Sequence, residues 1–150
     1  MNDLRANVIE GIADMLINMP QHPIADQGKF GKVDLQTRFY NPLLVSILAD
    51  VNKKVLLRWP NKMEETVPQI RPDAIVSTVV QLKFGPSLGY GEVKPGDDST
   101  TNQSLCNDTM KLAVLSRNAA QKNDHPIISF QVNGKIQQRG RFLWKAHVKP

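Results

Sequence analysis

The stretch GYGEVKPGDD, residues 89–98, places an acidic and a basic residue on either side of a single valine. In an extended strand successive side chains point to opposite faces, so Glu92 and Lys94 project together and Val93 points the other way. That is the geometry that a catalytic pair requires. Because any half-buried strand also produces it, the triplet alone leaves open whether Glu92 and Lys94 are functional or simply face solvent.

A second carboxylate, Asp73, stands upstream in RPDAIV, at the start of a long apolar segment. Eighteen residues lie between Asp73 and Glu92, and two adjacent strands could bring them side by side at one end of a sheet. Two carboxylates in contact repel each other unless a cation or a proton lies between them. Mg²⁺ commonly uses one or two protein carboxylates and leaves other positions to water and phosphate. Lys94 could then contact that water or phosphate; the alternative is a capped turn after Pro72 and a weak surface ion pair.

The elements that must position these residues begin with helices. Apolar residues at helical spacing predict a helix over 2–19. Prolines and glycines in 20–32 predict a loop. A second helical pattern covers 33–51, with Pro42 either in a first turn capped by Asn41 or inside one kinked helix.

The hydrophobic period then changes to that of strands. Strands are predicted at 53–59, 73–84, 88–94 and 126–132. A turn is expected at Gly85-Pro86-Ser87, and the segment 104–122 predicts a helix capped by Asn102 or Ser104. Asn133-Gly134 predicts a two-residue hairpin after the last strand. This order of elements indicates an α/β or α+β domain.

The pattern RPD followed by GEVK resembles the PD-(D/E)xK phosphodiesterase superfamily, whose restriction-endonuclease-like fold has an αβββαβ core with a mixed central sheet flanked by helices. The predicted elements over 34–132 follow that order. Residues 1–33 would be an N-terminal helix and loop extension of the same single domain, and 133–150 a basic C-terminal hairpin or tail. The stretch FGPSLGYGEVKPG is also similar to uncharacterised fungal proteins with this nuclease-like signature.

The resemblance implies metal-dependent hydrolysis of phosphodiester bonds in DNA or RNA. Mg²⁺ or Mn²⁺ would be held by Asp73, Glu92 and the main-chain carbonyl of Val93, and Lys94 would orient the attacking water. Many superfamily members add an acidic ligand from the helix before the strands. The candidates here, in order of preference, are Asp34, Glu65 and Glu10. Two alternatives remain: an inactive nuclease-like module that binds nucleic acid, and a structural or protein-interaction domain.

The net charge of +5 is concentrated late in the chain. Residues 111–150 contain eight Lys or Arg and one Asp, giving +7, whereas residues 1–110 contain eleven Lys or Arg and thirteen Asp or Glu, giving −2. A basic segment can bind a phosphate backbone without regard to sequence, and it can equally be a solvated surface. The candidate nucleic-acid contacts form an aromatic and basic patch: Arg139, Arg141, Trp144 and Lys145.

Composition, with 41% hydrophobic and 22% charged residues, is that of a globular protein. Cys106 is the single cysteine, which excludes an internal disulfide and favours a reducing compartment. No window approaches 18 uninterrupted apolar residues, and charges interrupt the N-terminal segment in a way untypical of a secretory signal. We therefore expect an intracellular protein, in the nucleus or the cytoplasm, with no membrane partner.

Overall fold

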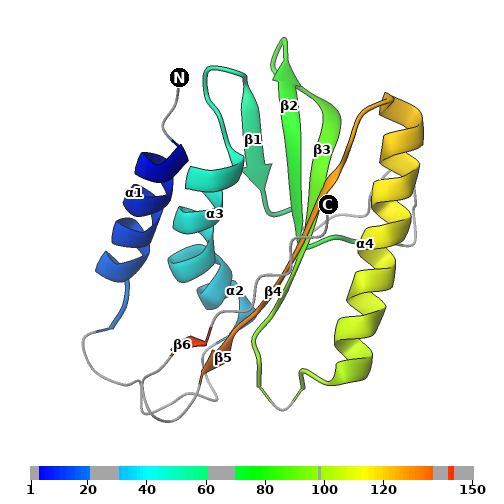
Figure 1. Ribbon diagram of the computed structural model, residues 1–150. Helices are drawn as coiled ribbons and strands as arrows, with labels where there is room; N and C mark the ends of the chain where they lie inside the picture. The colour runs from blue at the N-terminus through cyan, green and yellow to red at the C-terminus, as the bar shows by residue number, and fades with distance from the viewer. Residues whose placement is uncertain (1–3, 21–30, 61–69, 98, 137–141, 144–150) are drawn as a thin grey trace.

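The computed structural model describes residues 4–20, 31–60, 70–97, 99–136 and 142–143. A four-stranded sheet with the order β1-β2-β3-β4 lies between helices (Figure 1). Its strands are β1 (Val55–Arg58), β2 (Ala74–Val80), β3 (Lys83–Lys94) and β4 (Ile128–Asn133). The first three run antiparallel and β4 runs parallel to β3. The prediction of a mixed α/β fold with a mixed sheet flanked by helices is therefore confirmed.

The N-terminal helices pack against each other on one side of the sheet (Figure 1). They are α1 (Leu4–Ile17), α2 (Lys32–Asp34), the π-helix η2 (Leu35–Tyr40) and α3 (Asn41–Leu48). The last three are continuous, so the kinked-helix alternative is the one found. Because Pro42 has no N–H to donate, the helix widens before it, and the Asn41 N–H donates five residues back to the Gln36 carbonyl. Within the described part of the chain no helix is both long and apolar enough to cross a membrane.

The hairpin between β2 and β3 turns at Gln81 and Leu82, both of which have positive φ (49° and 62°). The prediction of a turn at Gly85-Pro86-Ser87 is wrong, because these residues lie inside β3. They coincide with a shift in the register between the two strands. A bulge tolerates proline, which cannot donate to the ladder of hydrogen bonds, and this explains how Pro86 fits within a strand.

The helix α4 (Asn102–Asn123) connects β3 to the parallel strand β4. Its cap is Thr101, whose hydroxyl accepts from the Ser104 N–H at 3.1 Å. The Ser104 hydroxyl in turn accepts from the Thr101 N–H at 3.0 Å, which completes a capping box. Of the two predicted caps, Ser104 thus contributes from inside the first turn and Asn102 is the first helical residue.

The predicted hairpin at Asn133-Gly134 is not formed. The Gly134 N–H donates to the Lys94 carbonyl at 3.1 Å, so the chain continues along β3. A separate two-stranded sheet pairs β5 (Lys135–Ile136) with β6 (Phe142–Leu143). Neither Asn133 nor Gly134 has the positive φ that a two-residue hairpin turn of this type requires. A Cβ at position 134 would instead collide with the Tyr40 hydroxyl, so glycine is explained there by close approach.

The two faces of the sheet bury separate apolar clusters. Val93 packs with the cluster formed by the N-terminal helices, whereas Tyr90 packs with the cluster that includes Leu112 and Leu115 of α4. Because side chains alternate along β3, Glu92 and Lys94 share the α4 face with Tyr90. The fold therefore places the acidic and basic residues of the triplet beneath a helix.

Candidate functional site

The carboxylate of Glu92 lies in the protein interior, between β3 and α4. The residue is 2% exposed. Its Oε1 atom is buried and has no hydrogen-bond partner in the part of the chain that the structure describes. A buried carboxylate oxygen without a partner carries a substantial desolvation cost, so Glu92 is unfavourable for stability unless something else compensates it.

Asp73 lies directly before β2 and is held beside the triplet by the main chain of β3. Its N–H donates to the Gly91 carbonyl at 3.0 Å, and its Oδ2 accepts from the Val93 N–H at 2.8 Å. Its Oδ1 forms an ion pair with Lys32 Nζ at 2.6 Å. These contacts fix the Asp73 carboxylate next to Glu92, which is the juxtaposition that the sequence hypothesis requires.

The electrostatics of Glu92 reflect this proximity. Burial is the largest effect, and the negative charge of Asp73 and a hydrogen bond between the two carboxyl groups add to it, so that the pKa of Glu92 is raised to about 8. The nearby Lys111 acts in the opposite direction, and Asp108 raises the pKa of Glu92 further. At neutral pH Glu92 therefore keeps its proton, which lies between the two carboxyl groups.

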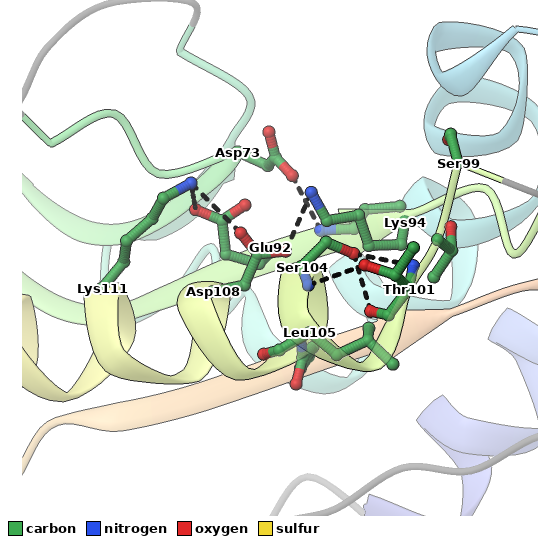
Figure 2. A network of polar contacts seen from close by, with 12 residues as sticks. Asp73, Glu92, Lys94, Ser99, Thr101, Ser104, Leu105, Asp108 and Lys111 are labelled. Atoms are coloured by element: carbon green, nitrogen blue, oxygen red, sulfur yellow. Dashed lines mark hydrogen bonds and ion pairs between the residues drawn. The ribbon is translucent and has the colours of Figure 1, made fainter.

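The helix α4 contributes two residues that the sequence analysis did not identify, Asp108 and Lys111. Asp108 is 1% exposed. Its Oδ1 accepts from Lys111 Nζ at 3.1 Å, and its Oδ2 forms an ion pair with Lys94 Nζ at 3.0 Å. Lys111 Nζ also lies 4.0 Å from Glu92 Oε1. Figure 2 shows Lys94 from the strand and Lys111 from the helix converging on Asp108, with Glu92 and Asp73 beside them.

The ammonium group of Lys111 stays charged. Burial lowers the pKa of Lys111, but its hydrogen bond to Asp108 and the charge of Glu92 outweigh that effect, and its pKa is raised. Three carboxyl groups and three lysines thus meet among the described residues, and one carboxyl keeps its proton at neutral pH. The cluster then has a net charge of about +1. Such a site can attract an anion through its lysines and a cation through its paired carboxylates.

No protein-family model, curated protein or solved structure matches this chain.

The paired carboxylates fit a hard divalent cation. Asp73 and Glu92 are forced together, and Glu92 presents an oxygen that lacks a hydrogen bond. A cation between them would relieve the repulsion that the shared proton now relieves. No group of three or more His, Cys, Asp or Glu side chains suited to a metal ion occurs among the described residues. Two carboxylates are nevertheless the usual protein contribution to Mg²⁺, which keeps several waters.

Of the other predicted ligands, only Val93 lies beside Asp73, and the rest are placed elsewhere or lie outside the described residues. The Asp34 carboxylate accepts from the Gly31 N–H at 3.1 Å and thereby caps its own helix. Glu10 is exposed on α1. Val93 directs its N–H to Asp73 and its side chain into the core. The remaining candidates are outside the described residues: Glu65, Arg139, Arg141, Trp144 and Lys145.

A sequence signal for Asp108 does exist. Asp108 precedes Leu112 by four residues and Leu115 by seven, so it occupies the apolar stripe of the predicted helix. Charged residues are almost never fully buried without a partner. An aspartate in that stripe therefore indicates a buried ion pair, although the sequence cannot say that Lys94 is the partner on the facing strand.

Proposed function

We propose that the protein is a divalent-metal-dependent hydrolase of phosphodiester bonds in nucleic acid, with a PD-(D/E)xK-like site. The observation that carries the proposal is the placement of the partly buried Asp73 carboxylate beside the buried Glu92, with the ammonium groups of three lysines around them. A site that only supports the fold gains nothing from two adjoining carboxylates. A site for a cation and a phosphate requires both charge types together.

In this proposal Asp73, Glu92 and the main-chain carbonyl of Val93 hold Mg²⁺ or Mn²⁺. When bound, such an ion lowers the pKa of a water and stabilises the charge that develops on the phosphate. Glu92 must first release its proton, so activity rises with pH as that proton is lost. Lys94 donates hydrogen bonds to the attacking water or to a phosphate oxygen. The attacking water releases a proton to solvent and its oxygen bonds to phosphorus, while the bond from phosphorus to the leaving sugar oxygen breaks and that oxygen takes up a proton from solvent.

The order of elements supports the same proposal at the level of the fold. The helical stretch 32–48, three antiparallel strands, α4 and the parallel strand β4 follow one another in the chain. We infer that this is a restriction-endonuclease-like αβββαβ core. In that core Asp73 precedes the second strand and the triplet ends the third, so both motif halves reach the same end of the sheet.

A second candidate function, binding of nucleic acid without cleavage, is favoured by the contact of Lys94. Its ammonium is 3.0 Å from the buried Asp108, and among the described residues it forms no ion pair with Asp73 or Glu92. The Oδ2 atom of Asp108 has no hydrogen bond within the described residues, so this contact is an ion pair without directional alignment. If Asp108 keeps Lys94, the site can hold a phosphate but lacks a group to orient the water.

Cleavage of plasmid DNA and of a long RNA, with Mg²⁺, with Mn²⁺ and with EDTA, separates the two candidates. We expect metal-dependent cutting that is lost in Asp73→Asn and Lys94→Ala. The matched control is Asp124→Asn, which removes an exposed carboxylate at a left-handed position that asparagine tolerates. Binding without cutting in every condition would favour the second candidate, and neither binding nor cutting would leave a structural or protein-interaction domain.

A further inference from the structure

An open pocket of about 420 Å³ adjoins the carboxylate pair and shares Asp73 with it. Its volume lies within the range of roughly 300 to 1,000 Å³ that is typical of small-ligand sites. The wall combines apolar surface from Trp59 and Val33 with two cations, Lys32 and Arg71, and the amide of Gln36. This mixture matches a ligand that has both an aromatic ring and a phosphate.

The aromatic wall is held in place by a hydrogen bond. The indole Nε1 of Trp59 donates to Asn41 Oδ1 at 2.8 Å, and the ring packs against the core cluster of the N-terminal helices. Trp59 is only partly buried and lines the pocket. A ring that is fixed at one edge and partly exposed is suited to stacking with a planar base, as aromatic side chains do in proteins that bind single strands.

Two cations line the pocket together with that ring, and one of them also contacts the candidate active site. Lys32 Nζ contacts Asp73 Oδ1, so the same residue lines the pocket and borders the carboxylate pair. Arg71 is exposed two residues before Asp73 and forms no ion pair among the described residues. Guanidinium groups bind phosphate through two parallel hydrogen bonds. A phosphate that entered here would thus meet Arg71 and Lys32 beside Asp73.

We propose that this pocket is a subsite for one unpaired nucleotide of a single-stranded nucleic acid. The base stacks on Trp59, its edge faces Gln36, and its phosphate lies between Lys32 and Arg71. The inference rests on the proposed function, because Asp73 connects the pocket to the carboxylate pair and so makes the bound nucleotide a neighbour of the bond to be cut. A base paired in a duplex cannot stack on a side chain, so single strands are the preferred substrate.

The test measures binding in EDTA, where no cutting occurs. A fluorescently labelled single strand of five thymidine nucleotides is titrated with the protein, and its anisotropy is followed. We expect Arg71→Ala to weaken binding about fivefold or more. The matched control is Arg38→Ala, which removes an exposed arginine of η2 outside the pocket and is expected to change the affinity less than about twofold. Inorganic polyphosphate and a labelled duplex serve as ligands without an available base.

Trp59→Leu tests the stacking wall and should weaken binding of the single strand about tenfold, with no effect on polyphosphate. Trp59 also packs against the core, so the Trp59→Leu affinity is interpreted only if thermal unfolding shows that this variant is folded. If it is not folded, the affinities of Arg71→Ala and Gln36→Ala for the single strand test the proposal instead. Equal losses in Arg71→Ala and Arg38→Ala, or equal affinity for duplex and single strand, would overturn the proposal. If these variants weaken binding of the single strand but the wild type never cuts nucleic acid with added metal, the nucleotide subsite is supported and the proposed hydrolase activity is rejected.

Discussion

The proton shared by Glu92 and Asp73 makes a sharp prediction for the variant Glu92→Gln. Glutamine has nearly the same shape, carries no charge, and can donate to Asp73 as the protonated acid does. In the wild type the pKa of Glu92 is raised from 4.5 to about 8. Between these pH values the folded protein keeps a proton that the unfolded chain releases, so raising the pH favours unfolding.

The magnitude follows from the size of that shift. Within this window the contribution of Glu92 to the free energy of unfolding falls by about 1.4 kcal/mol per pH unit. From pH 5.5 to pH 7.5 the stability of Glu92→Gln relative to wild type should therefore increase by about 2 to 3 kcal/mol. For a chain of this size that corresponds to roughly 5 to 10 °C in Tm. Urea unfolding of both proteins at several pH values measures the difference in the free energy of unfolding. The contributions of the other titratable groups cancel in this difference because they are the same in both proteins.

Two results would refute this reasoning. A stability difference between wild type and Glu92→Gln that does not change with pH would mean that Glu92 titrates normally and is not held against Asp73. A wild type that gains stability relative to the variant as pH rises would mean that lysines, not Asp73, dominate its surroundings. The control Asp124→Asn should follow the wild-type pH dependence, because Asp124 is exposed. Added Mg²⁺ at pH 7.5 should stabilise the wild type more than Glu92→Gln.

Three further predictions concern stability. Asp108→Asn leaves two lysines without their buried anion, so the free energy of unfolding should fall by about 2–4 kcal/mol in urea unfolding. Gly91→Ala places a Cβ against the Phe130 ring, and Tm measured by circular dichroism should fall in line with a loss of about 1–3 kcal/mol. Leu82→Gly relieves a left-handed position in a side chain that is 99% exposed, and should raise the free energy of unfolding by about 1 kcal/mol.

Each of these has a matched comparison. Gly31→Ala has its nearest neighbouring atom at 3.7 Å, an ordinary contact, and should leave Tm almost unchanged where Gly91→Ala lowers it. Val80→Gly, in the strand next to the turn, should lose stability where Leu82→Gly gains it. No loss in Asp108→Asn would show that water already compensates the two lysines, contrary to the burial of that carboxylate.

The orientation of the Glu92-Val93-Lys94 side chains was predictable because successive side chains of a strand always alternate between its two faces. Glu92 and Lys94 share one face, and Val93 enters the core on the other. The preceding turn was placed wrongly because Gln81-Leu82 has none of the residues that favour positive φ, whereas Gly85-Pro86 has the composition of a turn and forms a bulge. Local composition indicates where a backbone can bend. It does not say where the pairing of neighbouring strands requires the bend.

Only the part of the candidate site that lies on or beside the strands was predictable. Asp73 and the triplet belong to short local sequence patterns, whereas Asp108 does not. Lys94 was expected to contact the attacking water or the phosphate, and in the structure its ammonium contacts a helix residue fourteen positions later. The partner of a long, flexible lysine side chain depends on which carboxylates the fold brings within its reach. Several carboxylates lie near one another in this fold. Pairing of charges across elements is therefore the part of a site that a sequence pattern specifies least.

The way charge is distributed in the cluster links the two ligands of the proposed function. With Glu92 protonated, three lysines face two carboxylates, and the net charge is about +1. Exchanging that proton for a divalent cation adds one further positive charge, so a cation and a phosphodiester each favour the binding of the other. Asp108 limits this mutual increase in affinity, because its negative charge attracts the ammonium groups of Lys94 and Lys111. A phosphate that approaches Glu92 must compete with Asp108 for those ammonium groups, and an ion pair without directional hydrogen bonding at Oδ2 is the contact that yields most easily.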